Sequence, residues 1–364
     1  MLKVINVVGT RPNFVKVAPI HKLMVESNSI TPYLVHTGQH YDEKMSKVFF
    51  EDLGLPEPYR YLHVGSGSHA VQTAKVMIEF EKVCLELNPD LVLVVGDVNS
   101  TLAATLVAKK LGIKVAHVES GLRSFDNRMP EELNRLATDA IADLLFVSEQ
   151  SGLDNLKKEG VSSEKIIYVG NVMIDSLINN LDKARSLPTL DKYGVKSEKF
   201  ILATLHRPSN VDDENNLKVL VDIFKESSKI YDIIFPVHPR TIKNFERYNL
   251  LEEIIGNSRI HLIDPAPYLE FIGLMSKAAL LLTDSGGIQE ETTYLGVPCL
   301  TLRENTERPS TITEGTNMLI PTLSKDVVMD NIIKISNDDW EKGSIPKFWD
   351  GKASNRIVEY LEKI

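Results

Sequence analysis

The sequence contains very little cysteine: Cys84 and Cys299 are the only two in 364 residues. Both lie in apolar patterns, so we expect buried thiols rather than reactive ones. Two cysteines cannot form a disulfide framework or a clustered cysteine metal site. We therefore predict a protein of a reducing cytoplasm that holds no structural metal ion.

The sequence also lacks the features that attach a protein to a membrane or to nucleic acid. Its apolar runs are all shorter than the ~20 residues that span a bilayer. Met1-Leu2-Lys3 leads directly into a strand-like segment, without the layout of a signal peptide. The formal net charge is −9, whereas proteins that bind nucleic acid usually present a basic face. We expect neither a membrane nor a nucleic acid as partner.

Two common nucleotide-binding fingerprints are missing as well. The first loop, Gly9-Thr10-Arg11-Pro12, follows a strand-like segment and opens a helix, but it is not G-x-G-x-x-G. No Walker-type lysine followed by Ser or Thr occurs after a glycine-rich loop. An NAD or P-loop cofactor is therefore not expected. Arg11 and Lys16 nevertheless bring two cations to a helix start, which suits a diphosphate.

What the sequence does contain is a regular alternation of strands and helices. The first half predicts strands at 3–8, 32–37, 91–96, 114–118, 144–148 and 166–169, with helices at 13–26, 70–87, 101–111 and 131–142. The second half predicts strands at 200–204, 233–237, 260–263, 279–283, 298–302 and 317–320. Such alternation predicts right-handed βαβ units and a parallel sheet covered on both faces.

The length and one break in this rhythm predict two domains. We predict Rossmann-like domains at 1–180 and 200–345, a polar linker at 181–199 and a last helix within 346–364. Two such domains would place a ligand cleft between them, at the carboxyl ends of their strands. Ser354 could cap the last helix. That helix could pack back across the interdomain junction or only cap the second domain.

A phosphate-binding turn is predicted at Asp284-Ser285-Gly286-Gly287. An apolar run at 278–282 precedes it and helical spacing follows it, so a strand ends, the chain turns and a helix begins. The free N–H groups of a helix start attract phosphate. Glu290 and Glu291 could accept hydrogen bonds from sugar hydroxyls. The alternative is an ordinary turn with an Asp or Ser cap.

Three carboxylates are predicted to gather at the mouth of the first sheet. Asp97 and Glu119 each stand at the end of an apolar run, and Glu131 begins a helix. Crowded carboxylates can hold different protonation states, which suits general acid and base catalysis. Taken singly, Asp97 could be a structural cap, and Glu131 could complement a helix dipole.

Basic side chains follow the strands of the second half. His206 ends its first strand and could donate to an oxyanion, although it could also be a structural histidine. His238 repeats that placement one strand later. We predict no zinc site here, because the two histidines lack the local spacing of metal ligands. Arg308 could contact a carboxylate or a phosphate.

These motifs occur together in the order found in one family. They are Gly9-Thr10-Arg11-Pro12, Gly96-Asp97, His117-Val118-Glu119-Ser120-Gly121-Leu122-Arg123, Pro130-Glu131-Glu132, Asn134-Arg135, His206-Arg207, the 284–291 turn, Thr306-Glu307-Arg308-Pro309 and Gly351-Lys352-Ala353-Ser354. On these residues the chain resembles the non-hydrolysing UDP-N-acetylglucosamine 2-epimerases over essentially its whole length.

The resemblance implies a GT-B-like fold whose last helix, within 346–364, returns to the first domain. It also implies a homodimer that uses no cofactor. The reaction implied is the reversible conversion of UDP-N-acetylglucosamine to UDP-N-acetylmannosamine. A base removes the C2 proton while UDP leaves C1, which gives 2-acetamidoglucal, and UDP then adds back.

By the same match, the site residues fall into three groups. The catalytic group, without an assignment of acid and base, is Asp97, Glu119, Glu131 and His206. The UDP-sugar group is Arg11, Lys16, Arg135, Ser285, Gly286, Gly287, Glu291 and Arg308. The group for a second, activating UDP-N-acetylglucosamine is Gln39, His40 and His238.

The sequence departs from the family pattern at two places. Asn13 stands where bacterial members usually have Glu. Pro208-Ser209 follow His206-Arg207 where they usually have Arg-Glu, which weakens the case for an activator site. The rival activities are a hydrolysing 2-epimerase, a GT-B glycosyltransferase that uses a UDP-sugar, and a non-catalytic sugar-nucleotide sensor. The three carboxylates favour proton chemistry at carbon over sugar transfer and argue against a sensor, whereas the hydrolysing 2-epimerase stays open.

Overall fold

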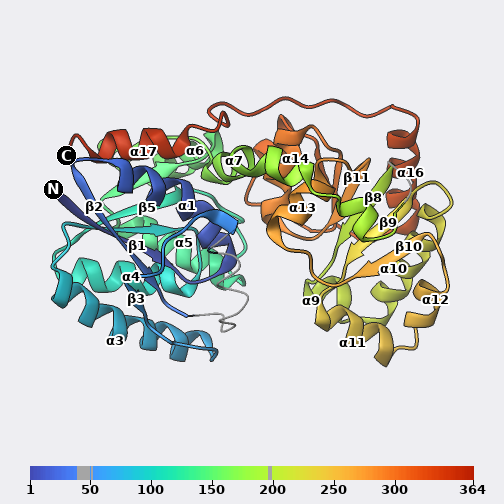
Figure 1. The fold of residues 1–364 in the computed structure, drawn as a ribbon, viewed down its shortest axis with the longest axis horizontal. Helices are drawn as coiled ribbons and strands as arrows, with labels where there is room; N and C mark the ends of the chain where they lie inside the picture. Colours follow the sequence, from blue (N-terminus) through green and yellow to red (C-terminus); the bar gives the residue numbers. More distant parts are fainter. Residues whose placement is uncertain (39–49, 51, 196–198) are drawn as a thin grey trace. The chain divides into compact units, whose positions relative to one another are not determined.

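The computed structural model describes residues 1–38, 50, 52–195 and 199–364. Contacts divide the chain into two compact units (Figure 1): unit 1 is Met1–Ile178 with Lys347–Ile364, and unit 2 is Asn179–Pro346. Each unit is built on one parallel sheet with helices, which confirms the predicted fold class.

The sheet of unit 1 contains all the strands predicted for the first half. Its order is β3 (Arg60–Tyr61), β2 (Ile30–His36), β1 (Leu2–Val8), β4 (Leu91–Val95), β5 (Lys114–Ser120), β6 (Leu144–Val147) and β7 (Ile166–Tyr168). Every neighbouring pair is parallel. The additional strand, β3, has two residues, too few to produce a hydrophobic period in the sequence.

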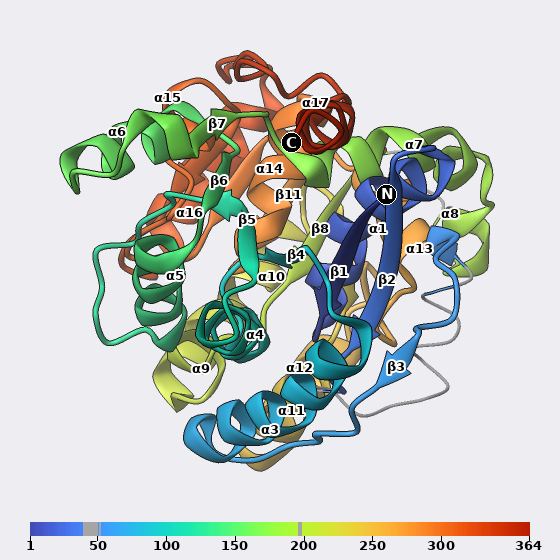
Figure 2. The same ribbon diagram turned by 90° about the vertical axis from the view of Figure 1, so that its left-hand side faces the viewer.

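Helices cover both faces of this sheet because its strand residues alternate between two cores. From β1, Val4 and Val8 face the core of α1 (Arg11–Glu26) and α17 (Ala353–Leu361). Ile5 and Val7 face the core of α3 (His69–Leu87) and α4 (Asn99–Lys110). Figure 2 shows these helix pairs on opposite sides of the sheet. The remaining helices of this part are α5 (Pro130–Ile141), α6 (Gln150–Lys158), η1 (Ser163–Lys165) and α7 (Val172–Ser186).

The last helix packs in unit 1, which decides between the two alternatives left by the sequence. Ile357 and Leu361 of α17 are buried in the core that contains α1, and both chain ends lie on this unit (Figure 1). The predicted cap is wrong, because the Ser354 hydroxyl has no hydrogen-bond partner. Asp175 of α7 caps the helix instead: its carboxylate accepts from the backbone N–H of Ala353 at 3.2 Å and of Ser354 at 2.6 Å.

The sheet of unit 2 has the same strand order as the first six strands of unit 1. It runs β10 (Ile260–Ile263), β9 (Asp232–Pro236), β8 (Phe200–Thr204), β11 (Leu280–Thr283), β12 (Cys299–Thr301) and β13 (Asn317–Leu319), all parallel. Ile201 and Ala203 of β8 pack in a core with α10 (Glu214–Ser227) and α16 (Lys325–Ser336). The other helices are α9 (Pro208–Val211), α11 (Pro239–Arg247), α12 (Leu251–Ile255), α13 (Tyr268–Met275), α14 (Gly286–Leu295) and α15 (Ser310–Thr313).

Much of the predicted linker at 181–199 is helical. Helix α7 continues to Ser186, and α8 spans Thr189–Lys192. Ala184 is buried, and a Cβ on Gly273 of α13 would lie 2.6 Å from its carbonyl oxygen. Pro188 stands at the N-cap of α8, so it marks a helix start. The polar composition that predicted a linker therefore belongs to helix surfaces.

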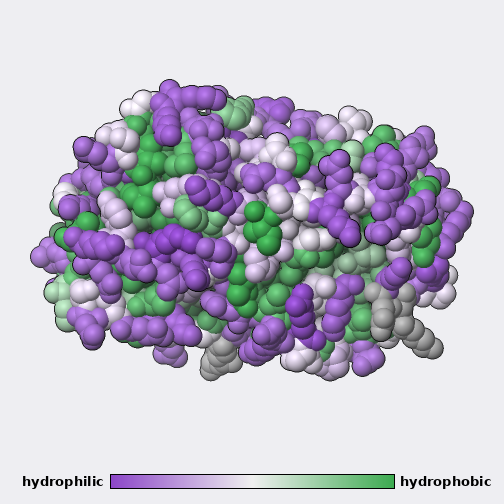
Figure 3. Space-filling model, turned by 90° about the horizontal axis from the view of Figure 1, so that it is seen from above, coloured by the Kyte–Doolittle hydropathy of each residue, from purple (hydrophilic) through white to green (hydrophobic). Residues whose placement is uncertain are grey.

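The surface is mixed in character. Hydrophilic side chains cover most of the face in Figure 3, and apolar ones form separate patches among them. Among the helices of the described residues, none has the length and apolarity that crossing a bilayer requires.

Candidate functional site

Asp97 and Glu119 follow neighbouring strands at one edge of the unit 1 sheet. Val95 of β4 pairs with Val118 of β5, so Glu119 comes directly after this pair and Asp97 comes one residue later, after Gly96. The register of β5 shifts between Val118 and Ser120. Glu119 has φ +69° and Gly96 has φ +68°, both left-handed. An irregularity of this kind interrupts the regular hydrogen-bond ladder and changes the direction in which the Glu119 side chain points.

Glu119 forms a buried ion pair with Lys16 of α1. The two side chains are 7% and 9% exposed, so water screens their attraction little. A Cβ on Gly96 would lie 3.3 Å from Glu119 Oε2, so glycine leaves room for this carboxylate. The sequence grouped Lys16 with Arg11 as two cations for one diphosphate. Arg11 is exposed, so the structure gives the two cations different surroundings.

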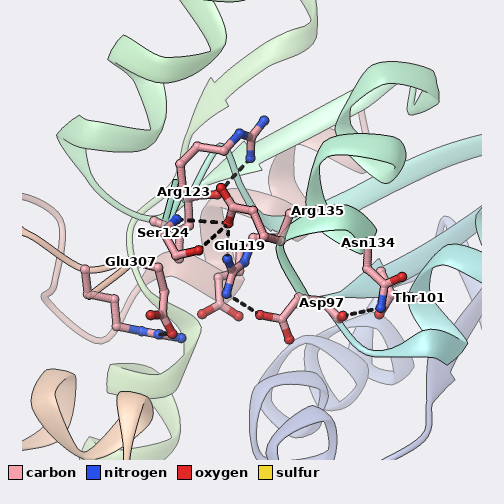
Figure 4. A network of polar contacts seen from close by, with 12 residues as sticks. Asp97, Thr101, Glu119, Arg123, Ser124, Asn134, Arg135 and Glu307 are labelled. Atoms are coloured by element: carbon pink, nitrogen blue, oxygen red, sulfur yellow. Dashed lines mark hydrogen bonds and ion pairs between the residues drawn. The ribbon is translucent and has the colours of Figure 1, made fainter. Parts of the chain in front are cut away.

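Asp97 is held by α5 (Figure 4). Its carboxylate pairs with Arg135 Nη2 at 2.6 Å, and its backbone oxygen accepts from Asn134 Nδ2 at 2.8 Å. Arg135 also pairs with Glu132 at 2.7 Å. The predicted substrate-binding Arg135 is thus the cation that accompanies Asp97.

The buried glutamate at the start of α5 is Glu132 rather than Glu131. Glu132 is 1% exposed, and its carboxylate accepts from Ser124 N at 2.9 Å and from Phe125 N at 3.0 Å. Glu131 is half-buried. Within the described ranges, no hydrogen bond or ion pair joins it to Asp97 or Glu119. Sequence reasoning missed Glu132, because adjacent glutamates give no signal of which one faces inward.

Asn13, which stands where bacterial family members usually have Glu, keeps the cap at the start of α1 intact. Asn13 Oδ1 accepts from Thr10 N at 3.1 Å and from Thr10 Oγ1 at 3.0 Å, as a capping glutamate would. Its amide Nδ2 also donates to Val95 O at 2.9 Å. A carboxylate could not donate, so Asn adds a contact between α1 and the end of β4.

In unit 2, the glycine turn after β11 leads into α14 as predicted. Ser285 stands at the N-cap but forms no side-chain cap bond. Among the described residues, none accepts a hydrogen bond from the backbone N–H of Gly286 or Gly287. The alternative of an ordinary Asp or Ser cap is therefore wrong. Open N–H groups at a helix start are the arrangement that binds an anion.

Two buried arginines lie beside this helix start. A Cβ on Gly286 would lie 2.9 Å from Arg308 Nη1 and 3.4 Å from Arg303 Nη1. Both arginines are 6% exposed, and Arg303 Nη1 has no hydrogen-bond partner. Burial lowers the pKa of Arg303, and the neighbouring Arg207 and Arg308 add to this effect. Sequence reasoning missed Arg303, although its place two residues after β12 could have pointed to it.

The two glutamates of α14 are buried beyond its first turn. Glu290, 1% exposed, forms an ion pair with Arg308 Nε at 3.0 Å. Glu291 Oε1 accepts from the Tyr268 hydroxyl at 3.3 Å. Burial, reinforced by the Glu290 charge, raises the pKa of Glu291 from 4.5 to about 8. Glu291 is therefore mostly protonated at neutral pH and can donate as well as accept.

This raised pKa predicts a pH-dependent stability. A carboxyl whose pKa is higher in the folded than in the unfolded protein destabilises the fold as pH rises between the two values, here 4.5 and about 8. The full loss of stability is reached above a pH of about 8. We expect Glu291→Gln to remove this loss, so that the variant gains on the wild type by up to ~1.4 kcal/mol per pH unit across that window.

Chemical denaturation at pH 5, 7 and 9 measures this difference. Glu252→Gln is the matched control, because Glu252 is exposed on α12. A Glu291→Gln difference from wild type that stays constant with pH would contradict the prediction.

His206 is paired with the aspartate of the glycine turn. Its Nδ1 lies 3.0 Å from Asp284 Oδ1, and its side chain is 48% exposed. Burial opposes the charge on Asp284, but His206 and the Arg207 backbone N–H outweigh it and lower the pKa of Asp284. Asp284 thus orients His206, with Nε2 left for a ligand.

His238 lies next to His206, with 6.3 Å between the ring centres. It caps α11 by accepting from Arg240 N at 3.2 Å. Gln39 and His40, predicted with it for an activator site, lie outside the described residues. Within the described ranges, no three His, Cys, Asp or Glu side chains are arranged to hold a metal ion.

Comparison with known proteins identifies relatives over the whole chain. Residues 22–362 match the model of the UDP-N-acetylglucosamine 2-epimerase family. A protein of Methanococcus maripaludis named a UDP-N-acetylglucosamine 2-epimerase homolog is 45% identical over 100% of both chains. A UDP-2,3-diacetamido-2,3-dideoxy-D-glucuronate 2-epimerase of Pseudomonas aeruginosa is 40% identical over 100% of both chains.

A solved structure is similar over the same length. The Methanocaldococcus jannaschii UDP-GlcNAc 2-epimerase in complex with UDP-GlcNAc and UDP has a TM-score of 0.90 and 43% identity, with 100% of each chain covered.

Proposed function

Because this chain belongs to the UDP-N-acetylglucosamine 2-epimerase family, we propose that it converts UDP-N-acetylglucosamine reversibly to UDP-N-acetylmannosamine without hydrolysis. The route is elimination of UDP to 2-acetamidoglucal, followed by re-addition. The observation that carries the proposal is the pair Asp97 and Glu119, which stand at adjacent strand ends, each with its own cation.

In this proposal the groups around α14 hold the UDP that leaves. The C1–O bond breaks with its electrons on the β-phosphate oxygen, so charge grows on the diphosphate. The N–H groups of Gly286 and Gly287, with the guanidinium groups of Arg303 and Arg308, supply fixed positive charge for it. Arg11 and His206 add a cation and a donor. Ser285 and Glu291 bind the rest of the nucleotide, the protonated Glu291 serving a ribose hydroxyl.

Asp97 and Glu119 carry the proton chemistry in the same proposal. Inversion at C2 requires removal of a proton from one face of the sugar and delivery to the other, and hence two acid/base positions. Lys16 and Arg135 pair with these carboxylates rather than binding phosphate. Glu131, a half-buried residue of α5, is the third candidate for an acid or base.

Incubation with UDP-N-acetylglucosamine in D2O, without an acceptor, tests this function. Abstraction and return of the C2 proton through solvent-exchanging carboxylates should give UDP-N-acetylmannosamine with deuterium at C2, read by proton NMR. Free N-acetylmannosamine with UDP would instead identify a hydrolysing 2-epimerase. Unchanged substrate would contradict the proposal and favour a transferase or a sensor.

A second candidate substrate follows from the Pseudomonas relative, which is 40% identical over the whole chain. UDP-2,3-diacetamido-2,3-dideoxy-D-glucuronate offers the same C2 chemistry with a carboxylate at C6. The same D2O experiment with this substrate compares the two values of kcat/KM, and the larger value identifies the preferred sugar.

We further propose that the chain forms a homodimer through α3. Val71, Ile78 and Leu85 on this helix are 47%, 57% and 68% exposed. They recur every seven residues, so they lie along one face. An exposed apolar stripe on a helix is the usual mark of a protein interface, and a second copy of this chain would cover it.

Light scattering on size-exclusion fractions should give twice the chain mass of 40.8 kDa. Ile78→Glu with Leu85→Glu should give the monomer mass. Ile255→Glu is the control, because Ile255 is 52% exposed on α12 of unit 2. A wild-type mass of one chain would contradict the dimer.

A further inference from the structure

The buried face of α5 is polar. Its buried side chains are Glu132, Asn134, Arg135, Thr138 and Asp139, whereas Leu133 between them is 53% exposed. A helix that only packs against its domain buries apolar side chains. A buried ion pair is often no more stabilising than apolar side chains of similar volume. The polar face of α5 therefore indicates a task other than stability.

This face holds the two loops that carry the proposed acid/base residues. Arg135 Nη2 pairs with the Asp97 carboxylate at 2.6 Å. Asp139 Oδ2 accepts from the backbone N–H of Gly121 at 3.0 Å, two residues after Glu119. Helix α5 is thus a shared support for the loop after β4 and the loop after β5.

Glu132 is the residue of α5 that joins the two loops. Its Oε2 accepts from Arg135 Nη1 at 2.7 Å, and the other end of that guanidinium holds Asp97. The same carboxylate accepts from Ser124 N at 2.9 Å, from Ser124 Oγ at 3.0 Å and from Phe125 N at 3.0 Å. Backbone N–H groups cannot rotate away, so they fix the carboxylate. The fixed carboxylate in turn orients the planar guanidinium.

A helix-dipole role does not account for this arrangement. A carboxylate in the first turn stabilises a helix even when it is exposed, and the half-buried Glu131 already supplies one. Glu132 is 1% exposed, and burying a carboxylate is costly unless it is paired and hydrogen-bonded. Its contacts reach outside the helix, to the loop after β5. Such burial is explained if this carboxylate has to be held rigidly.

We propose that Glu132 is a positioning residue for Asp97 and acts through Arg135. The loop N–H groups hold Glu132, Glu132 orients the guanidinium of Arg135, and the guanidinium holds Asp97 where it exchanges the C2 proton. This inference rests on the proposed function, in which Asp97 is one of the two acid/base groups. It adds a residue that sequence reasoning did not assign.

Glu132→Gln tests the proposal with little change in side-chain size. Glutamine accepts on one oxygen only, so its NH2 group would face donors that the second oxygen now binds. We expect kcat, per folded molecule, to fall by about 100-fold with KM nearly unchanged, because a catalytic group displaced by about 1 Å has an effect of that size. An unchanged kcat would overturn the proposal. Glu132→Asp withdraws the carboxylate by one methylene and should show the same loss if Glu132→Gln does not fold.

A double-mutant cycle separates positioning from a general loosening of the fold. Asp97→Asn removes the group that is positioned, so adding Glu132→Gln to it should lower kcat by no more than about twofold. A further loss of about 100-fold would make Glu132 merely structural. Asp143→Asn is the control: it loses the ion pair with Lys109 and the bond from Val115 N at the start of β5. That control should lose stability but keep kcat.

Crystal structures of the wild type and of Glu132→Gln test the positioning without any activity. In the variant the guanidinium of Arg135 should turn and lose its 2.6 Å contact with Asp97, while α5 and β4 stay in place. The same contact in both structures would overturn the proposal. If the wild type does not turn over UDP-N-acetylglucosamine, the proposed function fails, and the two structures still decide whether Glu132 positions Asp97.

Discussion

Glu119→Gln should lose turnover of UDP-N-acetylglucosamine by about 10²–10⁴-fold, the range that one general acid or base contributes. The amide keeps the size of the side chain but cannot take or give the C2 proton. UDP binding should be unaffected, because Glu119 is not among the groups proposed to hold UDP. Steady-state kinetics and calorimetric titration with UDP measure the two effects separately.

The buried ion pair requires a specific control. Glu119→Gln leaves the Lys16 ammonium, 9% exposed, without its carboxylate, and an unpaired buried charge destabilises a protein. The double variant Lys16→Met with Glu119→Gln should regain stability while turnover stays low. A double variant that regains turnover would show that Glu119 only balances Lys16.

Arg308→Met should lower the free energy of unfolding by about 3–5 kcal/mol, since it removes the cation of a buried ion pair. Glu290 is 1% exposed and loses its ion pair with Arg308, whereas Glu307 keeps Arg303 at 3.0 Å. The variant should also lose the rise in Tm that UDP gives the wild type, because a guanidinium beside the α14 start is gone. Chemical denaturation and thermal scans with UDP measure both.

Two further variants test whether Arg308→Met loses stability because its ion pair with Glu290 is buried. Arg308→Met with Glu290→Gln should recover most of the lost stability but not the UDP effect. Arg240→Met breaks an exposed pair with Asp212, whose side chains are 48% and 38% exposed, and should cost less than ~1 kcal/mol. Equal losses in Arg308→Met and Arg240→Met would contradict the argument.

The sequence predicted the regular elements because their signals are local. Alternation along Val4 to Val8 reports a strand with two buried faces, and the core residues of β1 confirm it. The Gly286-Gly287 turn follows an apolar run, so the helix start was also readable. Local signals fail where an element is too short, as in β3, or where polar residues form a helix surface, as in α7 and α8.

The carboxyl edge of a parallel sheet let the sequence place Asp97 and Glu119 near each other without a structure, because strand direction alone determines that edge. Which residues they meet was decided only by tertiary structure. Lys16 lies 103 residues from Glu119 along the chain, and Asp175 caps a helix 178 residues later. Likewise, burial of Glu132 rather than Glu131 depends on the packing of α5. Pairing and burial arise when distant segments pack together, and no local pattern records them.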